Sequence, residues 1–404
     1  MRYVRRSLEP VLLGAAGEFP VVVLTGPRQS GKTTLLRRLF SESHGYVSLD
    51  LPDVRASASA DPRGFLALHP PPVVFDEVQA VPELFPYLKA AVDENRERPG
   101  QFILTGSQNL LLGQGITESL AGRAAVLQLM PFSNRELAGL PDDPLPWQEG
   151  TRKEHPRQTH PYLWDKLIRG YYPEIATDPD RDSRLWHASY VQTYLERDVR
   201  SLRNIGDLGR FQLFLRALAA RNAQVLNLSN LSRDIGITVN SVKAWLSVLE
   251  ASYQVYILRP FFVNVGKRLI KTPKVYFTDL GTLCYLLGFH DPEQAMESPL
   301  AGSLFETAVV DEVLKALLHQ GIEPRMYYWR TLAGAEVDLV LEKGDELLPI
   351  EVKASTTPKP ETARHLRVFK HDFPERVLRG YVIHPGELTL PLGDGFIALP
   401  FARV

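Results

Sequence analysis

The sequence predicts a mixed α/β protein in three parts, and three observations lead to this prediction. Near its start, a β-branched strand runs into a glycine-rich turn and then a helix. The middle has the spacing of two helices joined by a tight turn, and the C-terminal region follows the order αβββαβ. The predicted boundaries are a first domain at 1–140, a linker and helix at 141–180, a helical domain at 181–290 and a last domain at 291–404.

Composition agrees with a globular protein of two or three domains. The chain has 404 residues, of which 44% are hydrophobic and 23% charged, and a single core rarely grows past about 250 to 300 residues. Its one cysteine, Cys284, cannot form an intramolecular disulfide, and no Cys/His cluster has zinc-ligand spacing. No apolar run reaches the roughly 20 residues of a membrane-spanning helix. We therefore expect a cytoplasmic protein with no membrane partner.

The first domain contains a P-loop motif. A short apolar strand ends at Thr25 and a helix opens at Thr34. Between them lie Gly26, Pro27, Arg28, Gln29, Ser30, Gly31, Lys32 and Thr33. In such a loop the backbone amides and the helix N-terminus face phosphate oxygens, while the lysine reaches the β- and γ-phosphates and the Thr33 hydroxyl binds Mg²⁺. The motif predicts that residues 26–34 bind ATP, whereas a plain glycine-rich turn would not require the strand and helix around it.

Two carboxylates end the next apolar run. Residues 72–77 read as a buried strand whose last two positions are Asp76 and Glu77. Asp76 would hold Mg²⁺ through water, and Glu77 would activate the water that attacks the γ-phosphate. The alternative is a solvated acidic turn, but the P-loop about fifty residues upstream favours the catalytic interpretation. The pair predicts hydrolysis.

A third strand and an arginine complete the candidate nucleotide site. The run 101–107 ends at Ser107, where ATPases of this type often carry a γ-phosphate sensor on a strand between the other two; Asn109 is the alternate. Arg123 follows a glycine bend at 119–122 and would stabilise charge on the γ-phosphate of its own or a neighbouring subunit. A neighbour's arginine implies a homo-oligomer. The alternative for Arg123 is an ordinary exposed arginine.

These strings resemble a known family. Gly26 to Leu36, Val74 to Gln79, Leu104 to Ser107 and Ser119 to Arg123 are similar to motifs of prokaryotic AAA-type P-loop ATPases that carry a C-terminal domain of unknown function. The resemblance extends over nearly the whole chain. It implies ATP binding and hydrolysis with Mg²⁺, and it implies no particular cellular role.

The middle of the chain is basic. Between positions 181 and 274 there are fifteen Lys and Arg against six Asp and Glu, a net +9, although the whole chain has a net charge of −1. Two helices, 230–235 and 239–250, flank the turn 236–238, and strands 255–258 and 274–278 would close the unit like a winged helix. The nucleic-acid candidates are Asn240, Lys243, Lys267, Arg268 and Lys271. We expect duplex or branched DNA as partner, with weak sequence preference; the alternatives are a solvated face or a module that only couples the other two domains.

The last domain carries a second candidate site. A helix over 302–319 precedes strands at 325–330, 336–341 and 347–352, a helix at 362–369 and a strand at 380–384. Glu306, Asp338 and Glu351 would hold Mg²⁺ through hard oxygen ligands, and Lys353 would position or activate water. This set resembles the active site of restriction-endonuclease-like PD-(D/E)xK nucleases, although the segment 335–338 lacks their leading proline. The alternative is a degenerate nuclease fold without activity.

Together these features predict an ATP hydrolase that acts on DNA. Hydrolysis would be coupled to engagement or remodelling of DNA, with metal-dependent cleavage as an additional activity. A competing hypothesis is a signalling or conflict-system ATPase that binds a protein partner and has an inactive nuclease-like domain.

Overall fold

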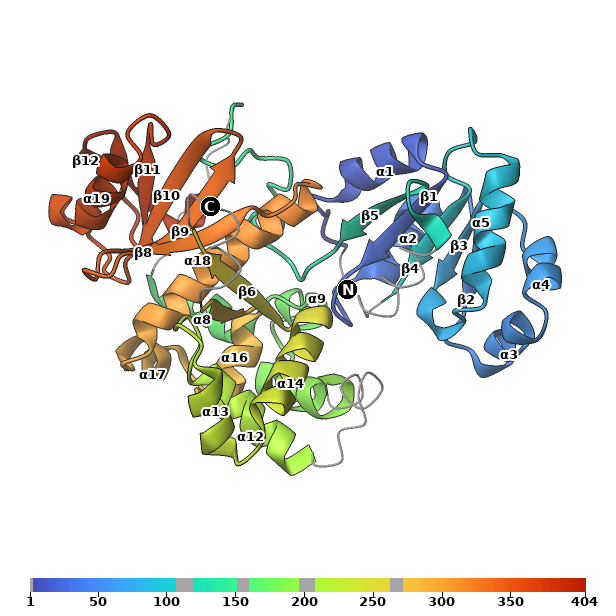
Figure 1. The fold of residues 1–404 in the computed structure, drawn as a ribbon, viewed down its shortest axis with the longest axis horizontal. Helices are drawn as coiled ribbons and strands as arrows, with labels where there is room; N and C mark the ends of the chain where they lie inside the picture. Colours follow the sequence, from blue (N-terminus) through green and yellow to red (C-terminus); the bar gives the residue numbers. More distant parts are fainter. Residues whose placement is uncertain (1–2, 107–118, 151–159, 196–207, 262–271) are drawn as a thin grey trace. The chain divides into compact units, whose positions relative to one another are not determined.

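The computed structural model describes residues 3–106, 119–150, 160–195, 208–261 and 272–404. These residues form two compact units (Figure 1). The N-terminal unit comprises Tyr3–Phe132 together with Leu317–Ile322, and the C-terminal unit comprises Ser133–Ala316 and Glu323–Val404. The helical part predicted at 181–290 and the domain predicted at 291–404 thus lie in one unit.

A five-stranded parallel sheet forms the centre of the N-terminal unit. Its order is β2-β3-β4-β1-β5, with β1 at Val21–Thr25, β2 at Gly45–Ser48, β3 at Val73–Asp76, β4 at Phe102–Thr105 and β5 at Ala124–Gln128. The three strands expected from the sequence are present as β1, β3 and β4, and β4 lies between the other two. Every residue of these three strands is buried, as expected for a parallel sheet covered on both faces.

Helices cover both faces of this sheet because side chains alternate along each strand. The helices are α1 (Glu9–Glu18), α2 (Lys32–Phe40), α3 (Pro52–Ala60), α4 (Pro62–Leu68), the 3₁₀ turn η1 (Val78–Ala80) and α5 (Leu84–Glu94). Val22 and Leu24 of β1 pack with buried residues of α1 and α2, whereas Val21 and Val23 pack with those of α3, α4 and α5. The loops that follow β1 and β3 leave the sheet at its carboxyl edge.

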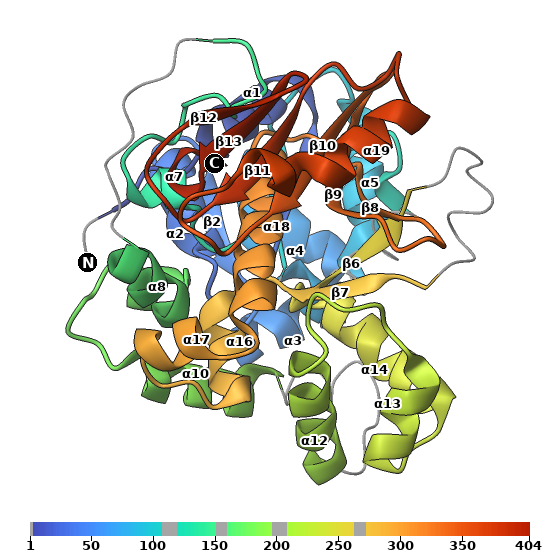
Figure 2. The same ribbon diagram turned by 90° about the vertical axis from the view of Figure 1, so that its left-hand side faces the viewer.

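The C-terminal unit has a helical part. It contains α7 (Asn134–Leu137), α8 (His160–Arg169), α9 (Pro173–Ala176), α10 (Ser183–Tyr190), a π-helical turn (Val191–Leu195), α12 (Leu208–Ala219), α13 (Leu228–Ile235), α14 (Val239–Ala251), α16 (Leu280–Leu287) and α17 (Pro292–Glu297). The predicted helix-turn-helix is confirmed as α13 and α14. Figure 2 shows α12, α13 and α14 packed beside one another. Of the helical domain predicted at 181–290, residues 196–207 and 262–271 lie outside the described residues.

The predicted αβββαβ order is also confirmed. Its members are α18 (Ala301–His319), β8 (Met326–Arg330), β9 (Glu336–Lys343), β10 (Glu346–Val352), α19 (Arg364–Asp372) and β11 (Gly380–His384). The full sheet has eight strands in the order β12-β13-β11-β10-β9-β8-β6-β7, with β6 at Val255–Pro260, β7 at Lys274–Phe277, β12 at Leu390–Gly393 and β13 at Phe396–Pro400. Two 3₁₀ turns, η4 (Pro360–Ala363) and η5 (Phe401–Arg403), complete the unit.

The strand pair expected to close a separate winged helix belongs to this sheet. β6 and β7 are antiparallel, as predicted. At its other edge, however, β6 pairs in parallel with β8, where Arg259 faces Tyr327 and Pro260 faces Tyr328. Phe261, directly after β6, is buried in the hydrophobic core beside the eight-stranded sheet. This shared sheet is the physical reason why the middle and C-terminal parts form one unit.

Candidate functional site

The P-loop connects β1 to α2 through backbone conformations that require glycine. Gly26 has φ +140°, and a Cβ there would lie 2.1 Å from the Leu129 carbonyl oxygen. Gly31 has φ +97° and caps α2. The Lys32 ammonium is buried over the loop, where it donates to the carbonyls of Gly26 at 2.9 Å and Pro27 at 2.8 Å. The predicted phosphate-binding residues therefore form one turn at the carboxyl end of β1.

The predicted magnesium ligands lie together at the same edge of the sheet. Asp76 is the last residue of β3 and is almost fully buried. The Thr33 hydroxyl donates to its Oδ2 at 3.0 Å. Glu77 follows with φ +58°, and its carboxylate accepts a hydrogen bond from Gln79. In addition, Ser30 Oγ and Gln29 Oε1 are buried without a hydrogen-bond partner in the described part of the chain. Hydroxyl and carboxylate oxygens together with unsatisfied polar atoms suit a nucleotide with a divalent cation.

Two residues that bind Asp76 were not predicted. Thr105 ends β4, is fully buried, donates its hydroxyl to Asp76 and accepts the Glu77 N–H at 3.3 Å. Tyr46 on β2 also donates to Asp76, and the Arg37 guanidinium lies 4.6 Å from its ring centroid. Burial, together with the hydrogen bond to Asp76, raises the pKa of Tyr46 to about 12. The sequence could have pointed to Thr105, because it is a polar residue at the end of a buried strand. The predicted sensor Ser107 lies outside the described residues.

A buried arginine, Arg6, stabilises the P-loop through hydrogen bonds to backbone carbonyls. Arg6 donates through Nη1 to the Ser30 carbonyl at 2.9 Å and through Nη2 to the Met130 carbonyl at 2.6 Å. Its guanidinium also lies 4.5 Å from the ring centroid of Phe132. The amide of Met130 donates to His319 Nε2 at 3.1 Å. The P-loop is thus tied to the segment that follows β5, and no local pattern around Arg6 signals this contact.

In the C-terminal unit the four predicted nuclease residues converge. Asp338 on β9 accepts the Val352 N–H at 2.8 Å, and the Lys353 ammonium lies 2.6 Å from Glu351 Oε1. Glu306 on α18 accepts the Tyr276 hydroxyl at 2.6 Å. We call the four acids Glu306, Glu336, Asp338 and Glu351, together with the lysines Lys274 and Lys353, the carboxylate cluster.

Burial and like charge shift the acids of this cluster strongly. Burial and the nearby Asp338 raise the pKa of Glu306 to about 7 and that of Glu351 to about 8. Burial also raises the pKa of Asp338. Desolvation alone would lower the pKa of Lys353, but Glu351 and the other acids raise it. The acids therefore share one electrostatic environment, as an active site would require.

The cluster is not preformed as a metal centre. Among the residues that the structure describes, no group of three or more His, Cys, Asp or Glu side chains is arranged to hold a metal ion. Glu306 is engaged by Tyr276 and Lys274, and one oxygen of Asp338 by a backbone amide. Among the acid oxygens of the carboxylate cluster, only Glu351 Oε2 is buried with no hydrogen-bond partner in the described chain. Metal binding by Glu306, Asp338 and Glu351 stays a prediction.

Comparisons with known proteins cover nearly the whole chain. Residues 18–138 match an AAA domain, 160–293 a domain of unknown function (DUF8612) and 301–404 a second one (DUF4143). The uncharacterized proteins Rv2008c of Mycobacterium tuberculosis and Mb2031c of Mycobacterium bovis are each 32% identical over 99% of this chain and 84% of their own length. The chain belongs to the prokaryotic AAA-type P-loop ATPases with a C-terminal DUF4143 domain. As a member of this family, the protein is an ATPase.

Solved structures give more distant likenesses. The Walker-type ATPase PABY2304 of Pyrococcus abyssi is 17% identical, with a TM-score of 0.45, over 70% of this chain and 96% of that one. The RuvB Holliday junction branch migration motor of Thermotoga maritima is 18% identical, with a TM-score of 0.27, over 62% of this chain and 86% of that one. At these TM-scores neither likeness carries an argument about function.

The structure places Arg123 of this AAA-type ATPase away from its own P-loop. Arg123 directly precedes β5, and its carbonyl accepts the N–H of Val21, the first residue of β1. It therefore lies at the amino edge of the parallel sheet, opposite the carboxyl edge that carries the P-loop. Its guanidinium makes two bonds to Asp93, at 2.6 and 2.9 Å. The geometry does not support action on its own subunit's nucleotide, and action on a neighbour's stays a prediction.

The helix-turn-helix of the family member exposes the expected face. Asn227 caps α13 and Thr238 caps α14, which fixes the turn between them. Asn240 and Lys243, as predicted, are exposed on α14, while Val242 and Trp245 are buried. Lys267, Arg268 and Lys271 lie outside the described residues. No helix in the described ranges combines the length and apolar character needed to cross a bilayer.

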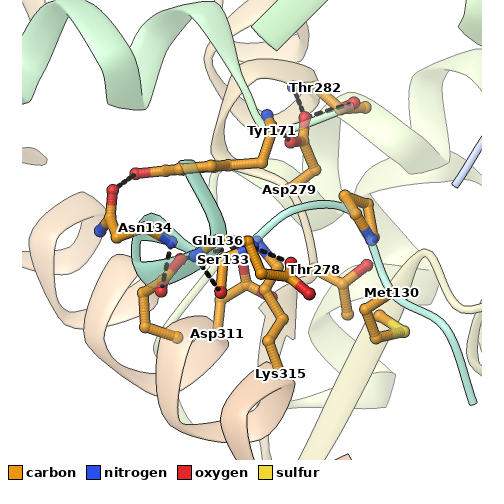
Figure 3. A network of polar contacts seen from close by, with 12 residues as sticks. Met130, Ser133, Asn134, Glu136, Tyr171, Thr278, Asp279, Thr282, Asp311 and Lys315 are labelled. Carbon is orange, nitrogen blue, oxygen red and sulfur yellow. Dashed lines mark hydrogen bonds and ion pairs between the residues drawn. The ribbon is translucent and has the colours of Figure 1, made fainter. Parts of the chain in front are cut away.

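A second buried ionic network, which sequence reasoning missed, lies along α18 (Figure 3). The Lys315 ammonium lies 2.6 Å from Asp311 Oδ2 and 4.4 Å from the ring centroid of Tyr171. The Tyr171 hydroxyl donates to Asn134 Oδ1 at 2.9 Å, and the backbone N–H of Asn134 donates to Glu312 Oε2 at 2.8 Å. Burial raises the pKa of Asp311 to about 8 despite its lysine partner. Partnered in this way, the network is best explained as a structural joint between α7 and α18.

Proposed function

We propose that this AAA-type ATPase hydrolyses ATP in a Mg²⁺-dependent reaction and uses the cycle to engage or remodel DNA. The single observation that supports the hydrolytic part is the carboxyl edge of the N-terminal sheet. There the P-loop, Asp76 and Glu77 meet within one hydrogen-bonded set that includes Thr33 and Thr105.

The roles follow from these positions. The amides of residues 26–33 and the Lys32 ammonium would bind the phosphate tail and neutralise charge that develops on it. Glu77 would orient and deprotonate the attacking water, because it follows a strand end next to Asp76 and its backbone is fixed by Thr105. Bound Mg²⁺ would be held by Thr33 and Asp76 and would offset the negative charge of the β- and γ-phosphates.

DNA engagement is supported by the exposed face of α14. This helix is the second of a capped helix-turn-helix pair, the position that enters a DNA groove in such motifs. Asn240 and Lys243 are one helical turn apart and exposed, so both can reach the same groove or backbone. Lysine contacts to phosphates would give affinity that depends on salt, while one asparagine provides little sequence discrimination.

DNA-dependent ATP turnover tests this proposal. We expect duplex or four-way DNA to stimulate turnover at low salt and the stimulation to fall steeply as salt rises. Lys243→Ala should weaken DNA binding and reduce the slope of log Kd against log salt by about 1. Lys343→Ala is the matched control, because Lys343 is an exposed lysine at the end of β9 outside the helix-turn-helix. Turnover that DNA does not change, with no DNA binding at low salt, would favour a protein partner instead.

Metal-dependent cleavage is a second activity that the convergence of Glu306, Asp338, Glu351 and Lys353 favours. In this role the acids would hold the metal ion and Lys353 would position water. Nicking assays with single-stranded, duplex and four-way DNA test it. Asp338→Ala should abolish the metal-dependent product, and a product that persists would come from another site or a contaminant.

A further inference from the structure

A lysine ammonium lies among the acids of the carboxylate cluster. Lys274, the first residue of β7, places its Nζ 3.0 Å from Glu306 Oε1 and 2.6 Å from Glu336 Oε1. Its side chain is only 4% exposed. The ring of Tyr328 covers the ammonium, with 5.5 Å from Nζ to the ring centroid. The ammonium is therefore held inside the cluster, unlike the mobile lysine of a surface ion pair.

The position of Lys274 is fixed by main-chain bonds. Its backbone pairs with Leu258 of β6, and a single bridge joins it to Val225. The neighbouring Tyr276 projects from the same side of β7 and donates to the same Glu306 oxygen. The strand thus delivers a positive charge and a hydrogen-bond donor to Glu306, one of the acids predicted to bind metal.

The acids of the cluster outnumber its lysines, so the Lys274 ammonium offsets part of their negative charge. Four acids and two lysines meet here, while the rim adds Arg330, 3.6 Å from Glu336, and His365, 3.8 Å from Glu351. Buried carboxylates without nearby positive charge are costly. Lys274 and a divalent cation would compete for the same oxygen of Glu306, and two cations a few ångströms apart in a buried site repel strongly.

We propose that Lys274 is the resident cation of the carboxylate cluster and that it keeps divalent metal ions out. The ammonium supplies the charge that a metal would supply at Glu306 and Asp338. The inference rests on the predicted metal-binding role of these acids, and it assigns the regulation of that site to a residue outside the nuclease-like motif. Metal binding then requires Lys274 to leave, so the wild-type protein binds such ions weakly at this site.

Mn²⁺ titration of the full chain tests the proposal. All five tryptophans of the chain lie in the C-terminal unit, at positions 147, 164, 186, 245 and 329, so tryptophan fluorescence during thermal unfolding reports on this unit and not on the nucleotide site. We expect MnCl₂ to leave the wild-type transition unchanged. Lys274→Met should unfold at lower temperature without metal, recover with MnCl₂ and bind Mn²⁺ at least about tenfold more tightly than wild type.

Three further variants separate the explanations. Lys274→Arg keeps a cation and should behave as wild type, and Lys343→Met removes an exposed lysine elsewhere and should change nothing. Lys274→Met combined with Glu306→Gln removes a ligand and should lose the gain in Mn²⁺ affinity.

Two outcomes would overturn the proposal. If Lys274→Met does not fold, the comparison of wild type with Glu306→Gln tests the proposal: tight Mn²⁺ binding by wild type that Glu306→Gln removes would overturn it. Lys274→Met protein that folds and binds Mn²⁺ no more tightly than wild type would also overturn it. Absence of ATP turnover in the wild-type protein would contradict the proposed ATP hydrolysis and not this inference.

Discussion

Replacing Thr105 with valine tests how the nucleotide site is organised. The threonine hydroxyl donates to Asp76 and accepts the amide of Glu77 at 3.3 Å, so one oxygen atom bridges the predicted metal ligand Asp76 and the predicted general base Glu77. Thr105 is fully buried, and valine has nearly the same volume and the same β-branch. The substitution therefore removes the two hydrogen bonds with little change in packing.

The expected loss follows from the two bonds. A hydrogen bond to a charged group contributes about 1.5–3 kcal/mol, and leaving the Glu77 amide unpaired costs roughly another 1 kcal/mol. In the proposed mechanism Asp76 and Glu77 act during hydrolysis, so part of this loss falls on the transition state, where about 1.4 kcal/mol changes the rate tenfold. We expect kcat for ATP to fall about 10- to 100-fold. ATP affinity should change only a few-fold, because the P-loop amides and Lys32 remain.

Phosphate release under steady state measures kcat, and equilibrium binding of a fluorescent ATP analogue measures affinity. Thr25→Val is the matched control: Thr25 is a buried threonine on the adjacent strand β1 whose hydroxyl donates to the Leu127 carbonyl at 3.1 Å and not to Asp76. It should lower stability to a similar degree and reduce kcat much less. The reasoning is refuted if Thr105→Val keeps the wild-type kcat or loses no more than Thr25→Val.

Four other outcomes are expected. Lys32→Ala should abolish ATP turnover and weaken ATP binding, measured with the same two assays; persistent hydrolysis would contradict the nucleotide assignment. Glu77→Gln should keep ATP binding but slow hydrolysis by about 10²–10⁴-fold, as for loss of a general base. If Arg123 acts on a neighbouring subunit, wild-type specific activity should rise with protein concentration and that of Arg123→Ala should not; equal curves exclude this role. The C-terminal unit should lose stability as pH rises from 6 to 8.5. Folding raises the pKa of Glu306 to about 7 and that of Glu351 to about 8 from an ordinary 4.5, so in this window the folded state binds more protons than the unfolded state. The free energy of unfolding then falls by up to ~1.4 kcal/mol per pH unit for each extra proton that the folded state binds. Tryptophan fluorescence during denaturant unfolding measures the last effect, and stability that rises with pH would contradict it.

Local sequence patterns were sufficient to predict features that lie within one element or two neighbouring elements. The P-loop, the strand ending in Asp76 and the capped pair α13 and α14 all follow from spacing within about twenty residues, and each is present in the structure. The αβββαβ order also follows from hydrophobic periodicity. Thr33 and Asp76 are both predicted to hold Mg²⁺, and the structure places the Thr33 hydroxyl 3.0 Å from Asp76 Oδ2.

Contacts between distant segments were not predictable in this way. Arg6 reaches the carbonyls of Ser30 and Met130 across 24 and 124 positions, and no short motif encodes such a contact. The pairing of β6 with β8 likewise joins residues 259 and 327. A strand can pair at either edge, and the mostly apolar run of β6 suits a wing as well as a larger sheet. Tertiary burial therefore decides both cases.

The helix α18 contains residues of both units. The helix carries Glu306 of the carboxylate cluster and the buried Lys315, and it ends at His319 within a segment that belongs to the N-terminal unit. There His319 accepts the Met130 amide, while the Met130 carbonyl accepts Arg6, which also holds Ser30 of the P-loop. Hydrogen bonds of Arg6 and Met130 thus link the P-loop to the last residue of α18, and no motif within a single element predicts this series of contacts.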